Sequence, residues 1–169
     1  SAKRLSIDLL KQGQPGRASL ALAAIAHIHS LLNGAAKAKG FAQEAYDLAV
    51  RSQDAAAAGF ALAQGALARL RLAEYEPAEE LIDKSIGRFD RQADSEGSAF
   101  AQLVSAELAL AREDDEEARS CAADAIRSAG KLKAPWLKAR AGLVQAVCAA
   151  RAGDLETALR LLEGAEQDL

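Results

Sequence analysis

The stretch RAGDLETALRLLEGA (residues 151–165) places a Gly–Asp pair in front of Ala158 and two adjacent leucines. The stretch RLAEYEPAEELIDKS (residues 71–85) has the same order, with an acidic turn, an alanine and then aliphatic residues. A glycine readily ends a helix, and an acidic residue caps the N-terminus of the next helix. We therefore interpret both stretches as the corner of a helical hairpin that recurs along the chain.

The recurrence has a period of 40 residues, because Ala158 is preceded at that spacing by Ala118, Ala78 and Ala38. Alanine makes up about a quarter of the chain, so one all-alanine column would be weak evidence. Three such columns with aligned turns are strong evidence for an internal repeat. The other two columns are Ala21, Ala61, Ala101, Ala141 and Ala26, Ala66, Ala106, Ala146.

Helix punctuation follows the same period. Asp54 and Asp94 are expected N-caps, and Pro15 and Pro135 fit first helical turns, where a missing N–H costs nothing. A leading helix is expected within residues 1–13. The further helices are expected near residues 15–32, 38–51, 55–72, 76–92, 95–111, 115–129, 135–151 and 155–167, with Leu169 at the end of the last one.

These elements predict an all-α fold, a right-handed α-solenoid of stacked antiparallel hairpins with about nine helices, as a single domain over residues 1–169. Residues 1–13 would be the second helix of a preceding repeat, and four repeats would lie near 15–52, 54–93, 94–132 and 134–169. Ala38, Ala78, Ala118 and Ala158 are expected where helices touch, with Leu162 filling the seam. Because the chain begins without Met and in mid-repeat, we expect a fragment of a longer protein.

The composition bounds the function. A net charge of -3 and a pI near 5.5 argue against direct nucleic-acid binding. The spacing of Cys121 and Cys148 suits neither a disulfide framework nor a metal site, which favours a reduced, cytoplasmic setting. Residues 18–36 lack a formal charge, but their alanines and polar residues favour a buried helix over a membrane span.

The turn and second-helix pattern resembles the tetratricopeptide repeat. It is read at Ala73, Tyr75, Ala78, Ile82, Ser85, at Asp115, Ala118, Ala122, Ala125, and at Gly153, Leu155, Ala158, Leu162, Ala165. That family has a period of about 34 residues. The longer period here is similar to the helical arrays of large maltose-activator-like bacterial transcription regulators. Gly40 lies inside a predicted helix, at a cost of about 1 kcal/mol relative to Ala, so the first repeat fits least well.

The resemblance implies that the first helix of each repeat lines a concave face that binds a partner. The candidate rows are Leu20, Phe60, Phe100, Arg140; then Ala23, Ala63, Leu103, Leu143; and then His27, Leu67, Glu107, Val147. Phe60 and Phe100 are either inter-repeat core or paired anchors, and the core is favoured. The Lys and Asn pairs with which some members clamp a terminal carboxylate are missing.

No catalytic or metal-binding motif is visible, so we expect no enzyme activity and no cofactor or metal. His27 and His29 point to different sides of a helix. The run REDDEEAR (112–119) is interpreted as a helix start, where acids complement the helix dipole. Trp136 is interpreted as a cap over the adjacent helix pair.

The expected function is a non-enzymatic scaffold that binds a protein or peptide, or another domain of the same chain, in a bacterial transcription or signalling regulator. Two alternatives stay open: a domain that senses a small effector, and a self-association module that forms a homodimer. Nucleic acid and membrane are not expected partners.

Overall fold

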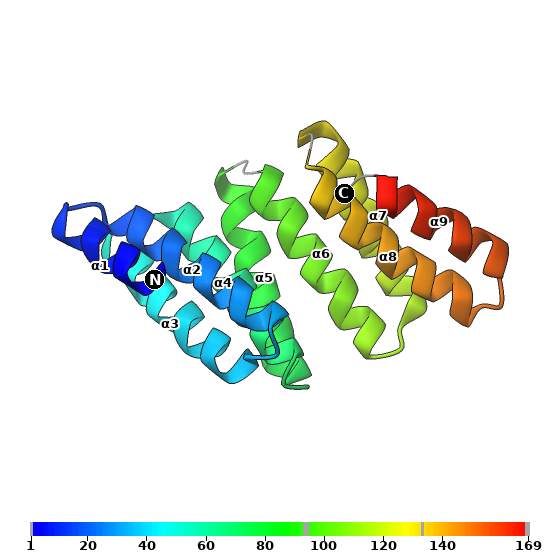
Figure 1. Cartoon of the computed structure of the whole chain (residues 1–169), viewed down its shortest axis with the longest axis horizontal. Coiled ribbons are helices and arrows are strands. Elements are labelled where there is room, and N and C mark those ends of the chain that lie inside the picture. Colours follow the sequence, from blue (N-terminus) through cyan, green and yellow to red (C-terminus); the bar gives the residue numbers. More distant parts are fainter. Residues whose placement is uncertain (1, 93–94, 133, 168–169) are drawn as a thin grey trace. The chain divides into compact units, whose positions relative to one another are not determined.

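The computed structural model describes residues 2–92, 95–132 and 134–167, and every element in these ranges is a helix (Figure 1). The all-α prediction is confirmed. The helices are α1 (Ala2–Lys11), α2 (Pro15–Leu31), α3 (Ala35–Arg51), α4 (Ala55–Leu70), α5 (Tyr75–Gln92), α6 (Ser95–Ala111), α7 (Asp115–Leu132), α8 (Pro135–Arg151) and α9 (Leu155–Gln167).

The expected helix boundaries are close to the observed ones. The largest differences are that α3 begins at Ala35 rather than at 38 and that α7 extends to Leu132 rather than to 129. Pro15 and Pro135 occupy first turns as predicted. Helix α3 continues through Gly40, whose Cα faces open space. The expected cap Asp94 and the terminal Leu169 lie outside the described residues.

Each hairpin corner combines a left-handed residue with an N-cap. Gly153 has a φ of +81°, and the N–H of Asp154 donates to the carbonyl of Ala149 at 3.0 Å, which closes the end of α8. The carboxylate of Asp154 then accepts from the N–H of Thr157 at 3.0 Å and starts α9. Positive φ recurs at this position one, two and three periods earlier, at Glu113, Ala73 and Asn33. The repeated corner is therefore defined by a left-handed backbone conformation that several residue types adopt.

The chain divides into two compact units, Ser1–Asp94 (unit 1) and Ser95–Leu169 (unit 2). In unit 1, α1 packs on α2, the hairpins α2–α3 and α4–α5 form, and α4 packs on both α2 and α3. In unit 2, α8 packs in the same way on α6 and α7, and α9 packs on α8. Each unit is thus an all-helical repeat. The single right-handed solenoid over the whole chain stays a prediction.

The alanine columns lie where helices touch. Ala38, Ala78 and Ala118 are fully buried, and Ala158 is 6% exposed. Small side chains at these positions let two helix backbones approach closely. This close contact takes the place of a core made of large side chains. Leu162 departs from the prediction, since 43% of it is exposed and it fills no seam within the described chain. No described helix is long and apolar enough to cross a membrane.

Candidate functional site

The row formed by Ala23, Ala63, Leu103 and Leu143 does not line an open face. Its first three members are buried, whereas Leu143 is 43% exposed. Ala23 lies in a buried cluster with Ala61 of α4, the next first helix of unit 1. The row therefore faces the following first helix, which corrects the expected partner-binding role of Leu103. Leu143 is exposed because no described helix covers α8 at this position.

The row formed by Leu20, Phe60, Phe100 and Arg140 is mixed. Leu20 is exposed on α2, whereas Phe100 is buried and lies with its ring centroid 6.0 Å from that of Trp136. Phe60 is half-buried and meets Phe89 of α5 edge to face, with the ring centroids 5.1 Å apart. Phe100 thus belongs to the core of unit 2 rather than to a partner surface. Trp136 covers it from α8, as expected of a cap.

The row formed by His27, Leu67, Glu107 and Val147 makes contacts between first helices within each unit. The Nδ1 of His27 lies 3.1 Å from Oε1 of Gln64 on α4. The guanidinium of Arg140 on α8 donates to the carboxylate of Glu107 on α6, and both side chains are largely buried. Leu67 is fully buried, which removes it from the partner surface, whereas Val147 is 41% exposed.

An exposed apolar surface remains on the last two helices, and we call it the α8/α9 face. Leu143 and Val147 lie one turn apart on α8, and Leu159 and Leu162 lie about one turn apart on α9. The first-repeat equivalents of Leu143 and Leu162 are Ala23 and Ala42, which belong to buried clusters that include Ala61 and Ala68 of α4. The α8/α9 face is therefore the surface on which a further first helix would pack.

A second surface is an open groove of about 400 Å³ in unit 1, with α3 and α5 as walls and α4 as floor. Its apolar floor is made by residues of α4, with Leu81 from α5 beside them. Its polar lining consists of Lys39, Gln43, Tyr46, Arg69 and Lys84, which we call the basic groove. Three of these side chains are cationic and none is acidic.

Two bridges tie the walls of the basic groove together. Glu74 accepts from Lys39 at 2.9 Å and from Arg69 at 2.8 Å, so one carboxylate serves two cations. The hydrogen bond from Lys39, and then the charges of Lys39 and Arg69, lower the pKa of Glu74. At the other bridge, Arg88 donates to the Tyr46 hydroxyl at 3.3 Å and lies over its ring. Positive charge therefore exceeds negative charge along the groove.

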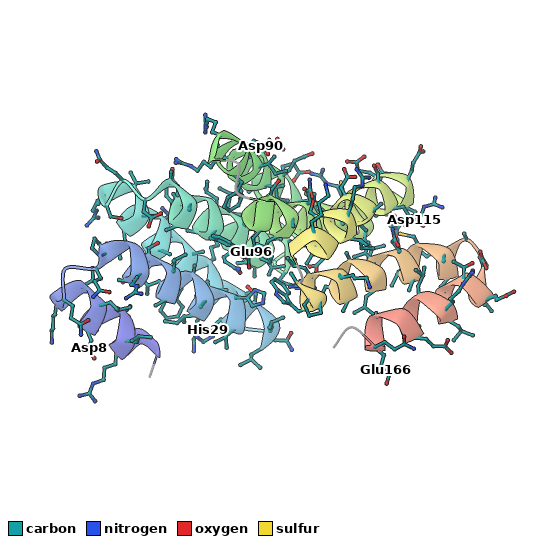
Figure 2. All side chains as sticks on the ribbon, turned by 90° about the horizontal axis from the view of Figure 1, so that it is seen from above. Asp8, His29, Asp90, Glu96, Asp115 and Glu166 are labelled. Carbon is teal, nitrogen blue, oxygen red and sulfur yellow. The ribbon has the colours of Figure 1, made fainter. Side chains whose placement is uncertain are left out.

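The remaining polar residues have structural roles. His29 stacks on Phe41, with the ring centroids 5.3 Å apart. Helix α7 begins at Asp115 (Figure 2), and the N–H of Glu117 donates to the carboxylate of Asp114 at 3.1 Å, so the run 112–119 contains a helix start as interpreted. Asp115 also accepts from Arg151 at 2.8 Å. Burial raises the pKa of both cysteine thiols. Among the described residues, no group of three His, Cys, Asp or Glu side chains is placed to hold a metal ion.

Sequence reasoning missed the basic groove, because its cations come from three helices and are far apart in the chain. A signal was nevertheless present in the repeat. The positions equivalent to Arg69 are His29, Ala109 and Ala149, and those equivalent to Lys84 are Glu44, Asp124 and Gly164. Cations that interrupt a column otherwise without Lys or Arg could have been singled out.

No protein-family model and no curated protein sequence matches this chain. Among solved structures, the crystal structure of BtubC (BKLC) from P. vanneervenii is similar, with a TM-score of 0.69 and 16% sequence identity. The match covers 91% of this chain and 64% of BtubC, so the chain spans less than two thirds of that protein. At this identity the likeness shows a shared all-helical fold and carries no function.

Proposed function

We propose that this chain is a non-enzymatic helical-repeat scaffold that binds another protein, or another part of its own polypeptide, through the α8/α9 face. The observation that carries the proposal is the exposure of Leu143 and Leu162 at positions that are packed in other repeats, with Val147 and Leu159 exposed on the same two helices. Leu143 and Leu162 are each 43% exposed, whereas the equivalent Leu103 and Ala122 are fully buried. Exposed apolar surface of this kind is typical of interaction sites.

The covered equivalents of this face suggest the chemistry of the partner. In unit 1 the covering helix α4 presents Ala61, Gly65 and Ala68, and a Cβ on Gly65 would lie 3.7 Å from that of Ala42. Small residues at spacings of three and four allow such close approach. We therefore expect a partner helix with Ala or Gly at this spacing. Leucines replace alanines on the α8/α9 face, so the partner is expected to sit slightly farther away.

Photo-crosslinking in cells tests the proposal. A photoreactive amino acid replaces Val147 or Leu159 on the face, and Arg127 serves as the control because its side chain is 69% exposed on α7. We expect one discrete crosslinked protein from the two face positions and none from the control. The substitution Leu162→Glu should abolish the crosslink without unfolding the chain, since this side chain is already exposed.

Two results would contradict the proposal, one about the partner and one about the site. If the crosslinked protein is a second copy of the chain, and sedimentation velocity shows a dimer that Leu162→Glu dissociates, the face is a self-association surface. If neither face position crosslinks to anything, or the crosslinks persist in Leu162→Glu, the α8/α9 face is not the binding site.

The wider context is also a proposal. We infer that the repeats are of the tetratricopeptide type, supported by the 40-residue columns, and that the chain works in the cytoplasm as the interaction or sensory part of a bacterial regulator. The basis of this inference is the resemblance of the turn and second-helix pattern to those repeats. Sequencing the complete gene tests it: an NTPase segment upstream or a helix-turn-helix downstream is expected, and a gene that encodes neither would contradict it.

A further inference from the structure

We propose that the basic groove of unit 1 is a binding site for a small organic anion, a carboxylate or phosphate attached to a short apolar body. The groove lies in unit 1 and the α8/α9 face lies in unit 2, so the proposal does not depend on the protein-binding role. Three observations carry it: the placement of the cations, the absence of cations at the positions of Arg69 and Lys84 in the later repeats, and the size of the groove.

The polar groups converge from three different helices. Lys39 stands on α3, Arg69 on α4 and Lys84 on α5, and all three line the same groove. The Tyr46 hydroxyl adds a neutral polar group on the α3 wall. A guanidinium and two ammonium groups around one space suit carboxylate or phosphate oxygens, to which they donate charge-assisted hydrogen bonds.

Packing of the repeat does not require a cation at the positions of Arg69 and Lys84. At the position of Arg69 the later repeats have Ala109 and Ala149, and both are buried within intact helices. At the position of Lys84 they have Asp124 and Gly164. An alanine therefore satisfies the fold where unit 1 has an arginine, so packing alone does not account for Arg69.

The groove is only partly neutralised within the chain. Glu74 is shared by Lys39 and Arg69, and Lys84 pairs with Glu80 at 3.8 Å between side chains that are mostly exposed. A pair of that kind is weak in water. An incoming anion could therefore bind Lys39 and Arg69, which share one carboxylate, and Lys84, whose ion pair is weak.

The dimensions and floor favour a small molecule over a second helix. A volume of about 400 Å³ is within the range of small-ligand sites, and its floor is made of Ala61, Leu62 and Gly65. The bridges Lys39 to Glu74 and Arg88 to Tyr46 join the two walls. A helix laid along the groove would have to break them, whereas a compact ligand would not.

Nuclear magnetic resonance titration with phenyl phosphate tests the site, with benzyl alcohol as the neutral comparison. We expect phenyl phosphate to shift the amide signals of α3, α4 and α5, and benzyl alcohol to bind much more weakly. Added sodium chloride should weaken binding, because the groove is open to solvent. Each of Arg69→Ala and Lys84→Ala should weaken binding about tenfold, the usual effect of losing one charge-assisted hydrogen bond.

The controls separate this site from general charge effects. Arg119 is the residue two periods after Lys39, so Arg119→Ala removes a cation at the equivalent position of unit 2 and should leave binding unchanged. Leu162→Glu should also leave it unchanged, since that residue belongs to the α8/α9 face. The far-ultraviolet circular dichroism and melting of Arg69→Ala should remain those of a folded chain.

Three results would overturn the proposal. One is the absence of shifts in α3 to α5 at millimolar phenyl phosphate. Another is equal affinity in the wild type, Arg69→Ala and Lys84→Ala. The third is binding of an acidic helical peptide at this groove without binding of phenyl phosphate, which would assign the surface to a protein partner.

Discussion

Gly59 and Phe89 share one space across the α4–α5 hairpin, since a Cβ on Gly59 would lie 2.7 Å from Cε1 of the Phe89 ring. Phe89 is fully buried, and the hydroxyl of Ser85 donates to the Gly59 carbonyl at 2.9 Å. One period earlier and one period later these positions hold small pairs: Ser19 with Ala49, and Ala99 with Ala129. The second repeat therefore has a large residue, Phe89, facing the smallest one, Gly59, where its neighbours have two small residues.

This exchange predicts that the effect of Gly59→Ala changes sign with its neighbour. In the wild type the added methyl group should cost about 1–3 kcal/mol of stability through overpacking. The better helix propensity of Ala offsets part of that cost. Phe89→Ala should cost about 3–5 kcal/mol through the cavity. In the Phe89→Ala background, Gly59→Ala should stabilise, because it restores the pair seen at Ala99 and Ala129. Urea denaturation of the four proteins measures this coupling, and additive free energies would contradict it.

The ion pair of Glu107 with Arg140 is expected to set how α6 and α8 pack. The side chains are 15% and 19% exposed, so Arg140→Met should cost about 2 kcal/mol or more by leaving the buried carboxylate without its arginine. The double variant Glu107→Leu with Arg140→Met should recover most of that loss. The exposed pair of Arg127 with Asp124 is the control, and Asp124→Asn should change the unfolding free energy by less than about 1 kcal/mol. Equal losses in Arg140→Met and in the double variant would show that charge is not the cause.

Glu74 predicts how stability depends on pH. Its pKa in the folded chain is lowered from an ordinary value of 4.5, first by the hydrogen bond from Lys39. Its stabilising effect is therefore fully present above the unfolded pKa and is lost as the pH falls through the folded pKa. We expect Glu74→Gln to lower the melting temperature at neutral pH and to differ less from the wild type in strong acid. Glu80→Gln is the matched control. A difference in melting temperature between the wild type and Glu74→Gln that grows as the pH falls would contradict this prediction.

Cys121 is expected to be an unreactive thiol despite its partial exposure. Burial, and then the hydrogen bond to Glu117, raise its pKa to about 12. Because the thiolate is the reacting form, its alkylation by iodoacetamide at mildly alkaline pH should be on the order of 1000-fold slower than that of an ordinary thiol. Glu117→Gln should speed the reaction by removing the negative charge. Mass spectrometry of the intact chain follows the rate, and alkylation at the rate of free cysteine would disprove the shift.

The local architecture was predictable because its causes are local. Asp54 caps α4 by accepting from the N–H of Ala57 at 2.9 Å, as its place before an alanine-rich run indicates. Pro15 and Pro135 begin helices as expected. Asn33, Ala73 and Glu113 adopt positive φ without being glycine, so the turn was found through the period rather than through residue type.

The binding surfaces were only partly predictable. Three of the residues expected to meet a partner, Phe100, Leu103 and Leu67, are buried, whereas Leu143 and Val147 are exposed. A column of equivalent positions contains the same types of residue whether it lines a groove or packs on the next helix. The pattern cannot separate these two cases, because both demand apolar residues at helical spacing.

By itself, the sequence determined the helices, their corners and the 40-residue period, since helix propensity, caps and small residues act over a few positions. Only the tertiary structure decided which faces of those helices are covered. Lys39, Arg69 and Lys84 line one groove because three helices bring them together, and Leu143 and Leu162 are exposed because no described helix lies over them. Burial and charge clustering depend on neighbours distant in the chain, and a periodic pattern repeats the residues without saying which neighbour each one meets.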